Sequence, residues 1–158
     1  MNDFLEKKLK ALKIKRYLPK NKTLANYKPF LLNSDFIFIS GQLPLTSKGI
    51  TFPGKISDKF DSKKIKKAVE ITTANLFWNL SDCLSDAKEK IKTIKCCNIK
   101  GYLNCDETFT DHPLILNFSS NIIVKILGEN GKHTRVAVGV SSLPMNSSVE
   151  IEGIFSIS

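Results

Sequence analysis

The stretch of sequence that decides the fold is Gly131-Lys132-His133-Thr134-Arg135-Val136-Ala137-Val138-Gly139-Val140-Ser141-Ser142-Leu143-Pro144, followed closely by Ser148-Val149-Glu150-Ile151-Glu152-Gly153-Ile154-Phe155. Its pattern predicts two β-strands joined by a turn at Pro144-Met145-Asn146. The groups of strong and opposite charge in these strands are Arg135 and the acids Glu150 and Glu152. We therefore expect the arginine of the first strand to face the acids of the second.

Arg135 is unusual for this chain, because only two of its 24 basic residues, Arg16 and Arg135, are arginines. A planar guanidinium binds a carboxylate or a phosphate through two parallel hydrogen bonds, whereas the lysine ammonium is a point charge. An arginine inside an apolar strand is therefore a candidate anchor for a ligand. The alternative is a structural ion pair with Glu150 across neighbouring strands, and the spacing leaves both interpretations open.

Length and composition predict one ordinary domain over residues 1–158, with residues 1–18 as an N-terminal helical extension. Apolar residues make up 42% of the chain, and ten are phenylalanines, which is enough for a proper core. No run of eighteen apolar residues occurs, and the N-terminus lacks the continuous apolar segment of a signal peptide. We expect a soluble cytoplasmic protein without a membrane partner.

The net charge of +9 raises the question of nucleic-acid binding. Residues 1–28 hold nine Lys and Arg against Asp3 and Glu6, so +7 of the +9 lies there. A lysine-rich surface without interleaved aromatic residues attracts polyanions loosely and does not read a sequence. We expect no specific nucleic-acid partner.

The four cysteines form no C-x-x-C pair and have no histidine at the spacing of a metal ligand. This pattern predicts buried free thiols and no metal site. The chain has two histidines. His112 has no evident carboxylate to orient it, and His133 is expected to hold the turn that leads into Arg135. The segment Gly128–Thr134 lacks the glycine and hydroxyl positions of a phosphate-binding loop, so we interpret it as a turn.

Hydrophobic periodicity predicts the remaining elements. A short amphipathic helix at 3–14 precedes a β-hairpin turning at Asn33-Ser34-Asp35, and residues 45–60 form a polar connecting loop. A long helix capped by Ser62, a strand and a second helix ending at Gly128 complete the order. We expect Leu114 and Val124 on the apolar stripe of the second helix. The expected ranges of the hairpin strands, the two helices and the strand are Tyr27–Leu32 and Phe36–Ser40, Ser62–Leu84 and Asp111–Leu127, and Lys92–Leu103.

This order favours a two-layer α+β sandwich, in which both main helices lie on one face of the sheet. Such a sheet leaves its other face uncovered. Apolar residues nevertheless occupy successive positions of its strands, as in Phe36-Ile37-Phe38-Ile39 and Val136-Ala137-Val138. Both faces should therefore be buried, the second against another subunit.

Several of these segments together resemble the Rid (YjgF-like, reactive intermediate deaminase) family. More narrowly, the sequence is similar to its longer subgroup, which has an extra N-terminal helix and a Gly-x-His-x-Arg motif. The matching segments span essentially the whole chain: Tyr27, Ser40-Gly41-Gln42-Leu43-Pro44, Leu116-Asn117, Gly131-x-His133-x-Arg135-x-Ala137-Val138-Gly139-Val140, Leu143-Pro144 and Val149-Glu150-Ile151-Glu152.

The resemblance implies a chorismate-mutase-like α+β fold with a mixed sheet. It also implies a homotrimer whose sheets form a central barrel and whose three clefts lie between subunits. Family members with the active arginine hydrolyse 2-imino and enamine acids to 2-oxo acids and ammonia, without a metal or another cofactor. The expected partner is thus a small carboxylate metabolite.

Carried over position by position, the resemblance makes Arg135 the group that binds the substrate carboxylate and Glu150 the acid that holds the attacking water. Ala137 stands where smaller members carry a cysteine, which favours the alternative of a trimer that binds a small carboxylate without turnover. Translation inhibition through ribonuclease activity is attached by name to part of the family, but the chain offers no general acid and base suited to cleaving RNA. The resemblance also implies cleft-lining positions at Tyr27, Gly41 and Asn117.

Overall fold

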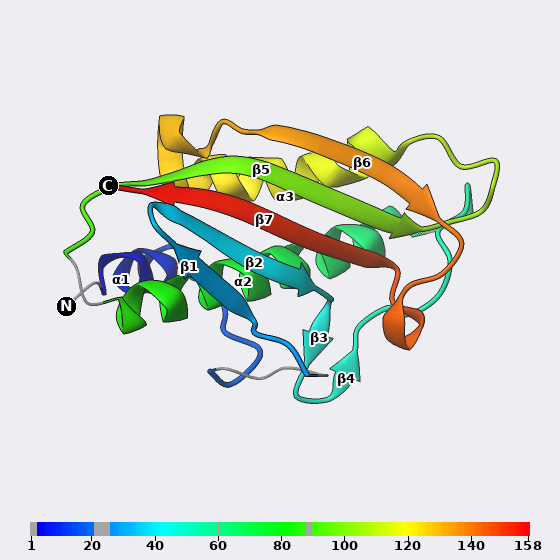
Figure 1. The fold of residues 1–158 in the computed structure, drawn as a ribbon. Coiled ribbons are helices and arrows are strands. Elements are labelled where there is room, and N and C mark those ends of the chain that lie inside the picture. Colours follow the sequence, from blue (N-terminus) through cyan, green and yellow to red (C-terminus); the bar gives the residue numbers. More distant parts are fainter. Residues whose placement is uncertain (1–2, 21–25, 60, 88–89) are drawn as a thin grey trace.

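The computed structural model describes residues 3–20, 26–59, 61–87 and 90–158, so the first two residues of the predicted extension 1–18 lie outside the described part. Its centre is a five-stranded mixed sheet with two long helices on one face (Figure 1). Along the sheet the strands follow the order β1-β2-β7-β5-β6. Their bounds are Phe30–Asn33 for β1, Phe36–Gln42 for β2, Val149–Ile157 for β7, Ile94–Asn104 for β5 and Thr134–Val140 for β6.

The position of β5 corrects the prediction that the strands around Arg135 and Glu150 are neighbours. β5 lies between them, parallel to β6 and antiparallel to β7. The physical reason is the crossover through helix α3 (His112–Leu127), which brings β6 back parallel to β5. The chain then crosses the end of β5 through the short 3₁₀ helix Pro144–Asn146 and returns on the far side as β7.

The two main helices form at the predicted places, and their ends follow from local chemistry. Helix α2 runs over Ser62–Asp86, but its cap is Asp61 and not Ser62, because the Asp61 carboxylate accepts a hydrogen bond from the Lys63 amide at 2.9 Å. Helix α3 ends at Gly128, whose φ of 64° favours glycine. The α+β fold with both helices on one face is confirmed.

The core lies between the sheet and these helices, and the faces of the strands alternate as the sequence indicates. In β2, Ile37 and Ile39 are buried against the helices, whereas Phe36 and Phe38 are 47% and 41% exposed on the opposite face. Val136 and Val138 of β6 are likewise exposed. The open face thus carries the apolar side chains that led us to expect a second subunit.

Two local predictions are wrong. The segment 45–60 is not an irregular loop throughout, because Leu45–Thr46 (β3) and Gly49–Ile50 (β4) form a small antiparallel ladder. In α3, Leu114 and Val124 are exposed although we expected them on the apolar stripe. The stripe instead follows the side that meets β5 and α2, and its buried members are Ile115, Leu116, Ser119, Ile123 and Ile126.

The N-terminal helix α1 (Phe4–Ala11) packs on α2 and buries Leu5 and Leu9. Beyond it, the Arg16 guanidinium donates two hydrogen bonds to the Asp82 carboxylate, one of them from Nη1 to Oδ1 at 2.9 Å. The Trp78 ring lies 5.1 Å from the same guanidinium, and the Trp78 indole donates to the Ile14 carbonyl. Arg16, the first of the two arginines, therefore binds a carboxylate through two hydrogen bonds from its planar guanidinium.

Within the described ranges, no helix is both long enough and apolar enough to cross a membrane.

Replacing Arg16 with alanine should destabilise the protein by about 3 kcal/mol, because the Asp82 side chain, only 8% exposed, would lose its partner. The measurement is urea unfolding at fixed protein concentration. The matched control is Lys20→Ala, which removes an exposed ion pair with Asp86 and should cost less than about 1 kcal/mol. Equal shifts of the two variants would contradict this account of the extension.

Candidate ligand site at the edge of the sheet

Three neutral acceptors hold the Arg135 guanidinium. Its Nη1 donates to the Ser120 hydroxyl at 2.9 Å, and its Nη2 donates to the Asn117 side-chain oxygen at 2.8 Å and to the Pro113 carbonyl at 3.3 Å. All three acceptors belong to α3. The side chain is half-buried, so the guanidinium is fixed in place yet still reaches solvent.

The register of the sheet explains why Arg135 reaches α3. Arg135 lies opposite the buried Ile99 of β5, so its side chain leaves the sheet on the helix face. Asn117 and Ser120 are three residues apart, and this spacing brings both onto one side of α3. Since β6 is an edge strand, the guanidinium is flanked by protein on one side only.

The predicted alternative, an ion pair between Arg135 and Glu150, is wrong. Arg135 pairs in register with Ile99, and Glu150 pairs with Tyr102 on the opposite face of β5. The two residues are separated by two strand spacings, about 9.6 Å, and by three residues, about 10 Å, along the strands. Of these acids it is Glu152 that forms an ion pair, at 2.7 Å with Lys100.

Within residues 3–20, 26–59, 61–87 and 90–158, Arg135 has no carboxylate partner. Neutral hydrogen-bond acceptors orient a guanidinium but leave its positive charge uncompensated. Such a group can bind an anion through its remaining donors without breaking an existing ion pair.

Glu150 lies directly against the backbone of β2 at Gly41. A Cβ built on Gly41 would stand 2.0 Å from Glu150 Oε1, so only glycine leaves room for this carboxylate. Burial raises the pKa of Glu150 above its ordinary value of 4.5, and the charge of Glu152 adds to the effect. The glycine predicted to allow a close approach therefore accommodates a carboxylate that binds protons unusually well.

The other predicted site residues fall into two groups. Asn117 and Ala137 accompany Arg135 beside α3, where Asn117 holds the guanidinium and Ala137 packs at the edge of the core. Tyr27 is 46% exposed and precedes Lys28, whose carbonyl accepts a hydrogen bond from Ser40, the neighbour of Gly41. A single chain thus brings Gly41 and Glu150 together but does not bring them to Arg135.

Sequence reasoning missed Ser120 and Pro113, which hold the guanidinium. Ser120 had a signal, because it lies three residues after Asn117 and so on the same side of a predicted helix. Pro113 acts through its backbone carbonyl, and the residue type gives no indication of that contact.

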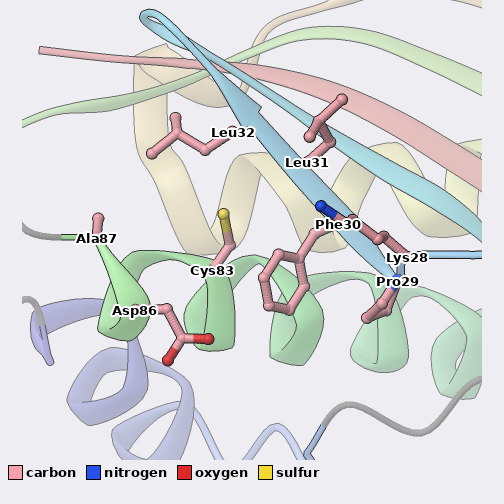
Figure 2. A pocket seen from close by; sticks show the side chains of 8 residues that line it. All are labelled: Lys28, Pro29, Phe30, Leu31, Leu32, Cys83, Asp86 and Ala87. Carbon is pink, nitrogen blue, oxygen red and sulfur yellow. The ribbon is translucent and has the colours of Figure 1, made fainter.

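A hollow of about 390 Å³ between β1 and the end of α2 is a weaker candidate (Figure 2). Its polar side chains are Lys28, Cys83 and Asp86. Asp86 is already paired with Lys20 at 2.6 Å, and burial raises the pKa of the Cys83 thiol to about 11. The hollow therefore offers little chemistry beyond apolar contact.

A second hollow, of about 300 Å³, contains Cys105 and His112, whose Sγ and Nε2 atoms lie 3.4 Å apart. Burial raises the pKa of the Cys105 thiol, which opposes its use as a nucleophile. In the part of the chain that the structure describes, no three His, Cys, Asp or Glu side chains are grouped so that they could hold a metal ion.

Comparison with known proteins decides the family. Residues 10–155 match the model of a family described as "YjgF/chorismate mutase-like, putative endoribonuclease". The chain belongs to the YjgF family. The resemblance inferred from the sequence is thereby confirmed, and α1 agrees with the subgroup that has an extra N-terminal helix.

Three relatives show how far the similarity to other YjgF-family proteins extends. The Agrobacterium tumefaciens protein Atu1372, of unknown function, is 34% identical with a TM-score of 0.80, and the match covers 99% of this chain and 94% of that one. Protein TCP17 of Trypanosoma cruzi is 25% identical over 82% of this chain and 79% of its own length. The Escherichia coli YjgF gene product is 15% identical with a TM-score of 0.58, covers 90% and 98% of the two chains, and supports the fold alone.

Replacing Gly41 with alanine should displace the Glu150 carboxylate but change the free energy of unfolding only a little. The new Cβ meets the mobile end of a side chain, so Glu150 can swing away at modest cost. Displacing a reacting group by about 1 Å can cost about 100-fold in rate. For imine hydrolysis, the reaction that the family resemblance implies, we expect a large loss of rate, with an unfolding midpoint close to that of the wild type. Full activity would contradict a role for this carboxylate.

Replacing Glu150 with glutamine should stabilise this YjgF-family protein at neutral pH. Because the folded-state pKa of Glu150 is raised, ionising it costs folding free energy above that pKa, and the cost disappears as the pH falls below the ordinary value of 4.5. The gain of Glu150→Gln should therefore be present at pH 8 and vanish towards pH 4, in urea titrations at both values. A gain that grows on acidification would contradict the assignment.

Proposed function

We propose that this protein hydrolyses small 2-imino and enamine acids to 2-oxo acids and ammonia. The observation that carries the proposal is the Arg135 guanidinium, held by Ser120, Asn117 and Pro113 and left without a carboxylate partner in the described chain. Its Nε hydrogen and one Nη1 hydrogen are not used by these contacts and can donate to the carboxylate of a small acid.

In this proposal Glu150 supplies the second group that the reaction needs. Water adds to the C=N carbon while the carboxylate takes one of its protons and returns that proton to the nitrogen, which forms a carbinolamine. The C–N bond of the carbinolamine then breaks, the hydroxyl proton leaves with the nitrogen as ammonia, and the 2-oxo acid remains. A carboxylate with a raised pKa accepts a proton from water more readily than an ordinary one does. An imine is already activated, so positioning and proton transfer account for most of the acceleration.

Arg135 and Glu150 can act on one molecule only if two copies of the chain meet. They leave the sheet on opposite faces, two strands apart. The exposed apolar face of the sheet, with Phe36, Phe38 and Val138, supports an assembly of copies. We propose a homotrimer with a cleft between subunits, in which Arg135 of one copy and Glu150 of another flank the substrate, and Tyr27, Gly41, Asn117 and Ala137 complete the lining.

Ala137 favours one of two related functions, and Glu150 favours the other. Its methyl group lies two residues after Arg135 on the same face of β6 and offers no reactive atom. The alternative is a trimer that binds a small carboxylate without turnover. Glu150, half-buried beside Gly41 with a raised pKa, favours the enzyme, since simple carboxylate binding needs no proton acceptor.

Replacing Arg135 with alanine should lower kcat/KM for 2-iminopropanoate by about 10- to 100-fold, because a hydrogen bond to a charged group contributes about 1.5–3 kcal/mol. The imine is generated in situ and trapped with semicarbazide, and the measured quantity is how well each protein competes with the trap. Arg135→Lys should recover only part of the loss, because it keeps the charge without the fork.

The matched control is Lys125→Ala, which removes one positive charge from an exposed position of α3. It should compete with semicarbazide as well as the wild type does. If wild type and Arg135→Ala compete equally, the enzyme proposal is wrong. A mass near that of the monomer in gel filtration would remove the cleft between subunits.

A further inference from the structure

His133 lies next to the proposed anchor, and its hydrogen bonds admit only one arrangement of protons when the ring is neutral. Its Nδ1 lies 2.6 Å from the Gly131 carbonyl, which can only accept, so Nδ1 carries the hydrogen. Nε2 is then an acceptor, and it lies 3.1 Å from the Ser120 hydroxyl. The ring is thereby fixed as the Nδ1–H tautomer.

Ser120 links this ring to the arginine. Arginine has donors only, so the Ser120 oxygen accepts from Arg135 Nη1 at 2.9 Å, and its single proton points to His133 Nε2. Hydroxyls in α2 behave differently: those of Thr72, Thr73 and Ser85 donate to the carbonyl four residues earlier in their own helix. The Ser120 hydroxyl is instead oriented across to the sheet.

Gly131 fixes the far end of the chain of hydrogen bonds. A Cβ at this position would stand 2.7 Å from the Ile123 carbonyl oxygen and 2.8 Å from Val124 Cα, so the segment packs directly on the backbone of α3. The carbonyl that orients His133 is therefore held by rigid neighbours. Gly131 ends the 3₁₀ helix Gly128–Gly131, and the chain is extended from Lys132 into β6. His133 and Arg135 are spaced by two in this extended segment, which places both side chains on the same face.

We propose that His133 is a positioning residue for Arg135. The hydrogen bonds run from the Arg135 guanidinium through the Ser120 hydroxyl and the His133 ring to the Gly131 carbonyl, and they hold the guanidinium in the orientation that receives a carboxylate. The inference rests on the proposed function of Arg135 as the carboxylate anchor. It gives Gly131, His133 and Arg135 of the Gly-x-His-x-Arg motif each a physical role, and it assigns His133 no contact with the ligand.

The test uses the fact that the chain contains two arginines, of which Arg16 is held independently by Asp82. Protein labelled with ¹⁵N-arginine should give two sets of guanidinium signals in the NMR spectrum. In the wild type both sets should show slow rotation about the Cζ–N bonds. In Ser120→Ala and His133→Asn, the Arg135 signals should broaden or average, while the Arg16 signals stay unchanged.

Two substitutions of His133 separate its contacts. Asparagine places a donor near the Nδ1 position and keeps only the contact to Gly131, whereas glutamine places an acceptor near the Nε2 position and keeps the contact to Ser120. We expect His133→Gln to preserve the rigid Arg135 signals and His133→Asn to lose them. The control Ser85→Ala removes a helical hydroxyl that bonds within its own helix and should change nothing.

The same variants are then measured in the semicarbazide competition. Ser120→Ala and His133→Asn should each raise KM about tenfold with a smaller change in kcat, and the double variant should be no worse than either, because both interrupt one chain of contacts. Unchanged Arg135 signals in Ser120→Ala and His133→Asn would overturn the inference. If the signals change as expected but the wild type hydrolyses no imine, the proposed function fails and the positioning role stands.

Discussion

One guanidinium underlies the proposed site, because neutral acceptors fix it and it lacks a carboxylate partner in the described chain. Ser120, Asn117 and Pro113 orient Arg135 without neutralising it, whereas Arg16, the other arginine, forms a paired contact with the buried Asp82. The chain otherwise uses lysine and has arginine at these two positions. Arg16 holds the N-terminal extension, and Arg135 keeps its charge available for an anion. The difference lies in the partner, since a carboxylate completes the first fork and uncharged oxygens leave the second open to an anion.

Close approaches that only glycine permits set the geometry around both proposed reacting groups. Gly41 lets the Glu150 carboxylate lie against β2, and the burial that results raises the pKa of Glu150. Gly131 lets the segment before β6 pack on the backbone of α3, which fixes the carbonyl that orients His133. The placement of β5 between β6 and β7 then directs Arg135 and Glu150 to opposite faces of the sheet. One copy of the chain holds the two halves of the proposed site apart, and two copies are needed to join them.

Local sequence patterns were sufficient to predict the two helices, the hairpin and the buried face of β2. The periodic spacing of apolar residues in a helix or strand indicates directly which side chains are buried. Local patterns did not reveal which strands are neighbours. The turn at Pro144–Asn146 has the local signals of a hairpin, although the chain there crosses the end of β5. Arg135 was recognisable from its rarity, and Gly41 from its place at the end of an apolar strand. The contacts of Arg135 with Ser120 and Pro113 could not be predicted from the sequence. They form where α3 packs over β6, and no residue spacing within either segment indicates them.

The most direct measurement of the central claim is a crystal structure of the protein grown with 2-oxobutanoate, a 2-oxo acid of the class that the proposed reaction releases. We expect the carboxylate of this molecule to accept hydrogen bonds from the Arg135 guanidinium, with Glu150 of a second copy facing its C2 atom. A carboxylate bound elsewhere while Arg135 stays open to solvent would contradict it. So would an assembly in which the Arg135 side chain is covered by protein and no ligand can reach it.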